Sequence, residues 1–239
     1  MPRLVIIKTG YTLPPIRQSH EDFEHWFRAG LGDGADITVC NVFEGEDPGS
    51  PEHWDGVLVT GSPAMVTDGE HWSESTAAWL KEVVDRGTPV LGICYGHQLL
   101  AHALGGLVGN HPEGREIGTR QIELTAEAAQ DVLLSGLPQT FPGQLTHSQS
   151  VLQLPEGAVH LGHSDMEPNQ AFRWGDSAWG LQFHPEFSEP VMHAYIDALQ
   201  DELESENLSP KALHDAVTDA PEAHSLLQRF TRIVAGEAV

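Results

Sequence analysis

Residues 89–104 read Pro-Val-Leu-Gly-Ile-Cys-Tyr-Gly-His-Gln-Leu-Leu-Ala-His-Ala-Leu. The apolar run over 89–93 is typical of a buried strand, and residues 95–104 form a helical pattern that ends at Gly105-Gly106. The strand passes into the helix with no connecting loop beyond the stretch Gly92–Gly96. Such a unit is the usual building block of a sheet with parallel strands.

The same alternation precedes this unit along the chain. The pattern predicts buried strands over 4–7, 36–43 and 56–60, and helices over 19–29 and 73–86. Ser19 is a plausible N-cap of the first helix, and Gly87 follows the second in the position that glycine favours after a helix end. Strands alternating with helices at this spacing predict an α/β fold with a mostly parallel central sheet.

The pattern changes after residue 110, where short strand-like segments are joined by loops. These segments predict a mixed or antiparallel section of the sheet, over 119–124, 144–151, 170–173 and 178–183. A helix is expected over 188–204.

A last amphipathic helix follows Asp219, its predicted N-cap, with an apolar face between residues 223 and 234. That face needs a partner, which is either the domain itself or a second copy in a homodimer. We therefore predict one domain over residues 1–200 with a C-terminal helical extension over 201–239, packed on or beside it.

Composition limits the classes of function. The chain has 239 residues, and 12 Lys+Arg against 35 Asp+Glu give a formal net charge of -23, which opposes binding to nucleic acids or anionic membranes. The N-terminal apolar run over residues 4–7 is too short for a signal peptide or a membrane span. The two cysteines, Cys40 and Cys94, form no disulfide framework. We expect a soluble, cytoplasmic protein with reduced thiols.

The sequence Gly92-Ile93-Cys94-Tyr95-Gly96 has the Gly-x-nucleophile-x-Gly arrangement, with cysteine where hydrolases often carry serine. Glycines at both ends let the strand and the helix pack closely around a sharp, strained turn. The helix N-terminus stabilises a thiolate at Cys94, and the backbone N–H of Tyr95 is placed to bind an oxyanion. The alternative is that Cys94 is only a small buried residue in the turn.

A thiolate nucleophile needs a base, and the base needs a group that orients it. Far downstream, the sequence Trp179-Gly-Leu-Gln-Phe-His-Pro-Glu186 is a strand that leads into His-x-Glu. His184 leaves the end of the strand, and Pro185 stiffens the turn so that Glu186 can reach the imidazole. His184 is therefore the candidate base.

These two motifs together, Gly-Ile-Cys-Tyr-Gly-His-Gln over 92–98 and Gln-Phe-His-Pro-Glu over 182–186, resemble the class I, triad-type glutamine amidotransferases. The chain is most similar to the glutaminase domain of GMP synthases and its free-standing relatives, over roughly residues 4–190. The resemblance implies a flavodoxin-like three-layer sandwich and a catalytic triad of Cys94, His184 and Glu186. Such a triad hydrolyses the glutamine side-chain amide through a γ-glutamyl thioester and releases ammonia.

The resemblance also assigns oxyanion and substrate positions. Thr60-Gly61-Ser62-Pro63 resembles the family's oxyanion turn, usually Gly-Gly-Pro, so Ser62 takes the place of the second backbone donor beside Tyr95. Serine keeps this role only if its dihedral angles suit an L-residue. Gly61 belongs to the same turn, and Gln98 matches the glutamine that holds the amino-acid end of the substrate.

The segment 145–151 falls where GMP-synthase-type domains carry Ser-His-Gly-Asp-x-Val, which gives mainly backbone contacts to the substrate. Thr146, Ser148 and Gln149 are the corresponding positions, and Ser148-Gln149 replaces the family's Gly-Asp. This departure bears on the identity of the substrate. Arg115-Glu116-Ile-Gly resembles the family's Arg-Glu-Phe-Gly, for which a structural role is expected.

The remaining candidates are assigned structural roles. Cys40 has no glycine turn around it and is expected to be a buried thiol. The pairs His97/His102 and His160/His163 lack the spacing and companions of a metal motif, so no metal and no cofactor are predicted.

Three functions follow from these motifs. The first is an amidotransferase-type hydrolase acting on glutamine or a γ-glutamyl amide. The roughly fifty residues after residue 190 cannot hold an ATP-dependent synthetase. Either a separate synthetase subunit uses the ammonia, or the protein works alone and hydrolyses γ-glutamyl conjugates such as γ-glutamyl polyamines or folate polyglutamates. The second, a Cys-His-acid α/β-hydrolase, is disfavoured because its acid would precede the histidine. The third is a non-catalytic subunit of the same fold.

Overall fold

The computed structural model describes all 239 residues, which form a nine-stranded sheet with helices on both faces. The strand order is β2-β1-β3-β4-β11-β10-β9-β6-β7, and the first five strands are parallel. These are β2 (Asp36–Asn41), β1 (Arg3–Lys8), β3 (Gly56–Val59), β4 (Val90–Ile93) and β11 (Ala178–Leu181). The α/β fold with a mixed section, expected from the sequence, is confirmed.

The other four strands extend the sheet in antiparallel fashion. They are β10 (Ala171–Trp174), β9 (Val159–His163), β6 (Glu116–Leu124) and β7 (Thr140–His147). A separate two-stranded sheet pairs β5 (Leu107–Asn110) with β8 (Gln149–Gln153). Thus β7 and β8, joined at Ser148, bring the segment 146–149 to the carboxyl end of the parallel strands.

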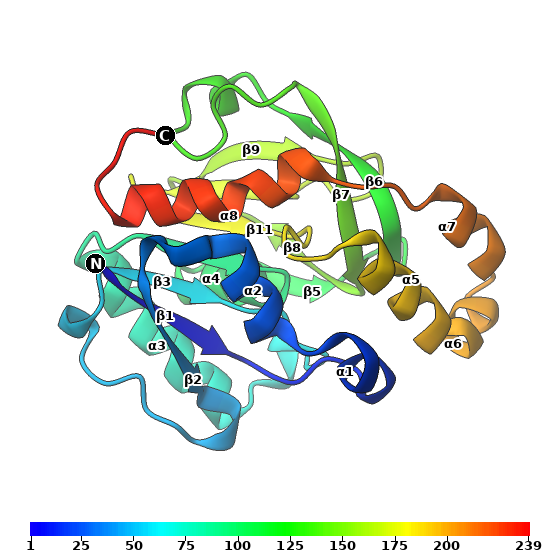
Figure 1. Cartoon of the computed structure of the whole chain (residues 1–239), viewed down its shortest axis with the longest axis horizontal. Helices are drawn as coiled ribbons and strands as arrows, with labels where there is room; N and C mark the ends of the chain where they lie inside the picture. Colours follow the sequence, from blue (N-terminus) through cyan, green and yellow to red (C-terminus); the bar gives the residue numbers. More distant parts are fainter.

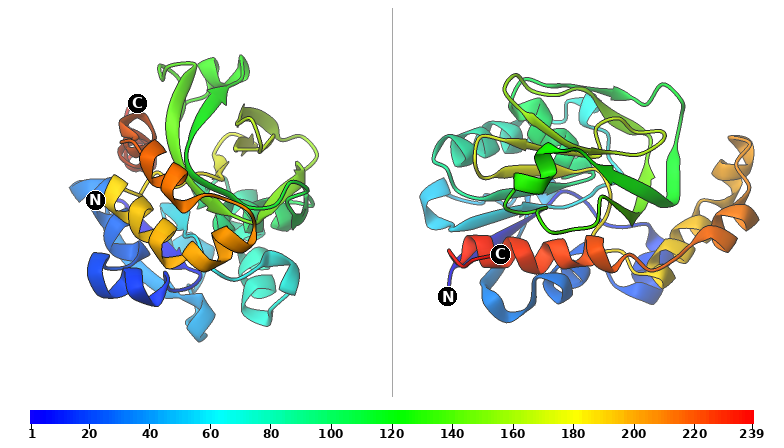
Figure 2. Two further views of the ribbon diagram at one scale, coloured as in Figure 1. Left: turned by 90° about the vertical axis from the view of Figure 1, so that its right-hand side faces the viewer. Right: turned by 90° about the horizontal axis from the view of Figure 1, so that it is seen from above.

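Helices cover the two faces of the sheet (Figures 1 and 2). Helices α2 (Phe23–Leu31) and α8 (Pro221–Val234) lie on one face, and α3 (His71–Asp85) and α4 (Tyr95–Ala103) on the other. Strand β1 shows the alternation that this requires, because Leu4 and Ile6 join the core under α2 and α8 while Val5 and Ile7 join the core under α3 and α4. The result is the three-layer arrangement expected from the resemblance.

The C-terminal residues form a helical group and one long helix. Helices α5 (Glu189–Ala198), α6 (Gln200–Ser205) and α7 (Pro210–Ala216) gather at one end of the molecule, beside α1 (Pro14–His20) and β6 (Figure 1). Helix α8 then returns across the sheet and packs on α2 and β7. On its apolar face Leu226 and Phe230 are fully buried, and Ile233 and Val234 pack partly buried against the same core, so the face predicted to need a partner is largely covered by the same chain.

Several element boundaries differ from those predicted. The helix expected over 19–29 is two helices, because Glu21 has a φ of 71° and Asp22 caps α2 by accepting a hydrogen bond from the N–H of Phe23. The helix over 188–204 is interrupted at Leu199, and α1, α7, β5 and β9 were not predicted. The N-cap of α8 is Ala220 and not Asp219.

Gly87, with a φ of 75°, ends α3 as expected. Short 3-10 turns complete the chain, at Gly32–Gly34, Val42–Glu44, Pro51–His53, Val66–Asp68 and Glu127–Gln130. None of the helices combines the length and the apolar character that crossing a bilayer requires.

Candidate active site

Cys94 lies between the end of β4 and the start of α4, in a strained backbone conformation. Its φ is 51° and its ψ is -102°, in a region that non-glycine residues rarely adopt. A Cβ on Gly92 would lie 2.4 Å from the carbonyl oxygen of Gly96, and a Cβ on Gly96 would lie 2.4 Å from that of Val59. The two glycines are therefore needed for the strand–helix approach that holds Cys94 in this conformation.

The surroundings of Cys94 favour negative charge. Cys94 is the N-cap of α4, where the N–H groups of the first turn point toward it and the helix dipole is positive. Its Sγ lies 3.8 Å from the carbonyl oxygen of Thr146. Because Tyr95 occupies the first helical position, its N–H has no acceptor within the helix and is available to a bound group.

His184 and Glu186 follow β11, the strand next to β4 in the sheet. The Nδ1 of His184 lies 2.7 Å from Oε1 of Glu186, and both side chains are almost fully buried. The imidazole stacks on Phe187 at a centroid distance of 4.0 Å. Its Nε2 is buried and has no hydrogen-bond partner, so one nitrogen is held by the carboxylate and the other is left for chemistry.

The charges around His184 control its protonation. Burial by itself lowers the pKa of His184, but the carboxylate of Glu186 and the sulfur of Cys94 more than offset this effect and raise the pKa to about 10. Cys94 and His184 line the same cavity. A protonated His184 beside a thiolate is the arrangement that a cysteine nucleophile requires.

A cavity of about 240 Å³ opens over Cys94 and His184. This volume is below the roughly 300–1,000 Å³ of pockets for drug-sized ligands, so it suits a small molecule of about one or two amino-acid residues. The other predicted site residues that line the cavity are Ser62, Tyr95, Gln98, Thr146, Ser148 and Gln149. Two predicted residues lie behind the lining: Glu186 supports His184, and Gly61 lies so close that a Cβ there would be 3.0 Å from Cε1 of His184.

The backbone of Ser62 meets the condition set for it from the sequence. Ser62 is not among the residues with positive φ, so serine occupies this position without strain. Its hydroxyl donates to the carbonyl of Thr9 at 2.8 Å and accepts from the N–H of Ala64 at 3.1 Å. The side chain therefore fixes the turn after β3 and leaves the backbone to face the cavity.

Gln98 and Gln149 contribute in different ways. The amide nitrogen of Gln98 donates to the carbonyl of Gln149 at 2.8 Å and to Oε1 of Gln182 at 3.0 Å, which leaves Oε1 of Gln98 as an acceptor. The Nε2 of Gln149 donates to Thr67 and Asn110, at 2.6 and 3.2 Å. The side chain of Gln149 thus holds neighbouring loops, and its carbonyl is held by Gln98 and His147.

A buried polar network lies behind the segment 146–149. A structural role was expected for Glu116, but its contacts were not identified from the sequence. The Nε2 of His147 lies 2.9 Å from Oε2 of Glu116, and both side chains are only 1% exposed. Glu116 also accepts from Ser164 at 2.6 Å and from Gln170 at 2.9 Å. The partners of Glu116 are 31–54 residues away along the chain, and no local pattern indicates them. The network fixes one wall of the cavity.

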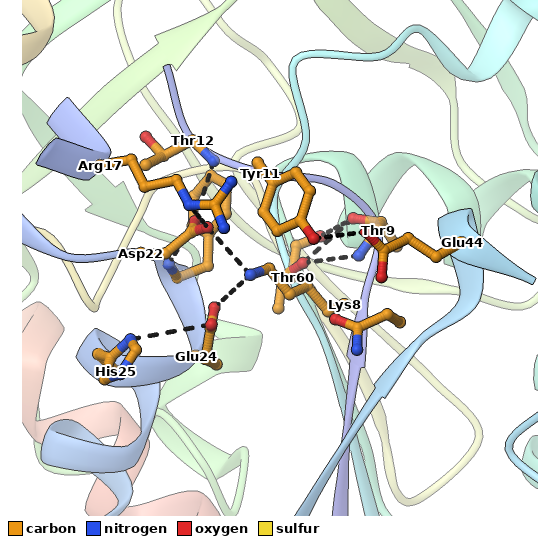
Figure 3. Close-up of polar contacts among 12 residues, drawn as sticks. Lys8, Thr9, Tyr11, Thr12, Arg17, Asp22, Glu24, His25, Glu44 and Thr60 are labelled. Carbon is orange, nitrogen blue, oxygen red and sulfur yellow. Dashed lines mark hydrogen bonds and ion pairs between the residues drawn. The ribbon is translucent and has the colours of Figure 1, made fainter. Parts of the chain in front are cut away.

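A second missed group of polar contacts surrounds Lys8 and Asp22 (Figure 3). The buried Nζ of Lys8, at the end of β1, lies 3.0 Å from Oδ2 of Asp22 and 2.6 Å from Oε2 of Glu24. Asp22 also accepts from the N–H of Thr12 at 2.9 Å, and the Thr12 hydroxyl lies 2.6 Å from that of Tyr195. Tyr195 lines the cavity, so these contacts tie the loop after β1 to α5 at the site.

Cys40 has none of these features. It is buried at the end of β2, and burial, with Glu46 and Asp47 nearby, raises the pKa of its thiol to about 11. A thiol of this kind stays protonated and unreactive at neutral pH.

Comparison with known proteins identifies the family of the chain. The family model "Glutamine amidotransferase class-I" matches residues 27–198. The chain is 27% identical over 226 residues to gamma-glutamyl peptidase 5 of Arabidopsis thaliana, an alignment that covers 91% of this chain and 90% of that protein. It is 39% identical over 131 residues to a glutamine-hydrolyzing GMP synthase of Aeropyrum pernix, covering 55% of this chain but 24% of that longer protein.

Solved structures share the fold. A glutamine amidotransferase from Thermotoga maritima superimposes with a TM-score of 0.77 at 24% identity, over 98% of this chain and 97% of that one. One from Methylobacillus flagellatus gives a TM-score of 0.75 at 23% identity, over 98% and 93% of the two chains. At these identities the likeness speaks for the fold alone, and the family model covers most of the sequence. The chain belongs to the class I glutamine amidotransferase family.

Proposed function

We propose that the protein hydrolyses γ-glutamyl amides, with Cys94 as nucleophile, His184 as general acid and base, and Glu186 as the group that orients His184. The observation that carries the proposal is the state of the imidazole: its Nδ1 is bound to Glu186, its buried Nε2 has no hydrogen-bond partner, and His184 and Cys94 line the same cavity. A histidine held in this way is suited to move a proton between sulfur and nitrogen.

Acylation begins when the thiol proton of Cys94 passes to Nε2 of His184. The thiolate adds to the amide carbon, and the carbonyl electron pair moves onto oxygen, where the N–H groups of Ser62 and Tyr95 stabilise the charge. His184 then gives its proton to the amide nitrogen as the carbon–nitrogen bond breaks. Ammonia or an amine leaves, and the γ-glutamyl group stays on sulfur as a thioester.

Hydrolysis of the thioester uses the same groups. His184 removes a proton from water, and the resulting hydroxide adds to the thioester carbon. The carbon–sulfur bond breaks, His184 returns its proton to the sulfur of Cys94, and glutamate is released. The amino-acid end of the glutamyl group is held during both steps by Oε1 of Gln98 and by the backbone of Thr146, Ser148 and Gln149, beside the turn that contains Gly61.

We also propose that the protein acts without a synthetase. Two residues that line the cavity, Tyr195 and Leu199, come from α5 and its end, so the C-terminal helices cover part of the opening through which a synthetase would receive ammonia. The relative that matches along nearly its whole length is a gamma-glutamyl peptidase. We infer a catalytic domain over 1–200, to which residues 201–239 are added as a helical extension, working in a reducing compartment such as the cytoplasm.

The test is hydrolysis of glutamine and of small γ-glutamyl amides, followed by release of ammonia or amine and of glutamate. The Cys94→Ala variant is expected to lose all turnover. Cys40→Ala is the matched control, because Cys40 is a buried thiol far from the cavity, and it should retain wild-type rates. Absence of turnover with every γ-glutamyl compound, or an equal loss in both variants, would refute the proposal and favour a non-catalytic subunit.

A further inference from the structure

The cavity carries an unusual charge for this protein. The chain has 35 Asp+Glu and 12 Lys+Arg, yet no aspartate or glutamate lines the cavity, and Arg115 is the one lysine or arginine that does. Neither the proposed chemistry nor the oxyanion donors use this arginine. An arginine N–H that opens into a cavity with no carboxylate in its lining favours an acceptor on the ligand, above all an anionic one, over a cationic group.

Arg115 is held in a fixed position. Its Nε and Nη2 donate to the two carboxylate oxygens of Glu206, at 2.9 and 3.1 Å, in a bidentate pair. Glu206 directly follows α6, and the side chain of Arg115 is only 18% exposed. Two of the three nitrogens are therefore occupied from outside the cavity, and Nη1, which has no partner in the protein, remains for a ligand.

The residues near the opening differ from those at the base. Cys94, Gln98 and His184, at the base, are at most 6% exposed, whereas Leu13, Arg115 and Leu199 are only partly buried. Leu13 precedes α1 and Leu199 ends α5, so apolar side chains share this rim with the arginine. With the glutamyl group on Gln98 at the base, the part of the substrate beyond the scissile amide lies at the rim.

We propose that the leaving group is an amino acid or short peptide with an apolar side chain and a free carboxylate, and that Arg115 binds this carboxylate. The inference rests on the proposed function and names its substrate class. Leu13 and Leu199 contact the apolar side chain, and Glu206 positions Arg115. A γ-glutamyl polyamine is disfavoured, because its free ammonium group would meet the guanidinium.

The experiment compares compounds that share the glutamyl group and differ beyond the amide. They are γ-glutamyl-leucine, γ-glutamyl-leucine amide and γ-glutamyl-1,4-diaminobutane. For the wild type we expect kcat/KM to be about tenfold or more higher for the leucine than for its amide, as one charge-assisted hydrogen bond contributes. The diaminobutane compound should be the slowest of the three.

Arg115→Gln should bring the leucine-to-amide ratio close to one, and Arg115→Lys should restore part of it. The ratio is measured within each variant, so a general loss of stability does not change it. Arg120→Gln is the matched control, because Arg120 lies on β6, the strand that begins directly after Arg115, and outside the cavity lining. It should keep the wild-type ratio. An unchanged leucine-to-amide ratio in Arg115→Gln would show that Arg115 only holds α6 in place through Glu206, and would overturn the proposal.

Two further arms separate the alternatives. In a γ-glutamyl-leucine whose glutamyl α-carboxyl is amidated, the effect of Arg115→Gln should persist; its disappearance would mean that Arg115 binds the glutamyl end, and the proposal would be wrong. Calorimetric binding of γ-glutamyl-leucine and its amide to Cys94→Ala protein needs no turnover. Equal affinities there overturn the subsite, whereas a preference for the carboxylate without any turnover in the wild type would refute only the proposed function.

Discussion

Replacing Gly96 by alanine is a sharp test of the strand–helix turn that presents Cys94. The added Cβ would lie 2.4 Å from the carbonyl oxygen of Val59 and 2.8 Å from its Cβ, against ordinary contacts of 3.4–4 Å. Both neighbours are fixed, one in backbone and one in a β-branched side chain of the central strand β3. Relief therefore requires α4 and β3 to separate by about 1 Å.

The stability change expected for Gly96→Ala is opposite in sign to the change that helix propensity alone predicts. Gly96 lies in the first turn of α4, where alanine would stabilise a helix by up to about 1 kcal/mol. Overpacking of a rigid core costs about 1–3 kcal/mol and occasionally more. We expect a net loss of about 2 kcal/mol, and a shift of about 1 Å two residues from Cys94 should also lower kcat/KM about 10²-fold.

Urea unfolding at neutral pH measures the stability change, and initial rates measure the catalytic one. Gly162→Ala is the matched control, because Gly162 also lies in a strand of the central sheet and a Cβ there would meet its neighbours at 3.4–3.6 Å. It should stay within about 0.5 kcal/mol of the wild type. A Gly96→Ala protein as stable as the wild type, with unchanged kcat/KM, would refute the packing argument.

Three other changes test the groups around the cavity. Glu186→Gln should reduce kcat about 10²-fold without abolishing it. It should also move the alkaline limb of the pH–rate profile down from about pH 10, because the carboxylate raises the pKa of His184. A limb that stays in place would contradict this role. Glu116→Gln should lower the free energy of unfolding in urea by about 1–3 kcal/mol, because it places an amide donor against buried donors. Glu123→Gln, at an exposed site on the same strand, should leave the free energy of unfolding almost unchanged. Equal effects would count against the network. Burial lowers the pKa of His97 to about 3 from 6.5, so the unfolded chain binds the extra proton and stability is lost as pH falls below about 6.5. The difference in unfolding free energy between wild type and His97→Gln should therefore shrink by about 1.4 kcal/mol per pH unit in urea titrations between pH 6 and 4. A constant difference would be evidence against a neutral buried imidazole.

The parts of the fold that were predicted depend on local pattern. The buried strands around Ile6, Leu58 and Leu91 are short apolar runs bounded by turn residues, and each one forms a central strand. The turn at Cys94 and the His-x-Glu sequence after β11 are equally local, so the sequence indicates both halves of the candidate site. Their close approach follows from the parallel pairing of β4 with β11.

The parts that were missed depend on contacts between distant residues or on single backbone angles. The break between α1 and α2 comes from the positive φ of Glu21, which no hydrophobic period reveals. A structural role was expected for Glu116 from the resemblance, but its partners on β7, directly after β9 and directly before β10 could not be identified from the sequence. The pair of Arg115 with Glu206 joins residues 91 positions apart, and it depends on how α6 folds back to the cavity.

The most direct test of the account is to find where the γ-glutamyl group is attached during turnover. The protein is mixed with γ-glutamyl-leucine, quenched in acid within the first turnover and digested. The masses of the cysteine-containing peptides are then measured by mass spectrometry. The account predicts a γ-glutamyl thioester on the peptide that contains Cys94, its absence in Cys94→Ala, and no adduct on Cys40. Turnover without an adduct on Cys94, or with an adduct on Cys40, would contradict it.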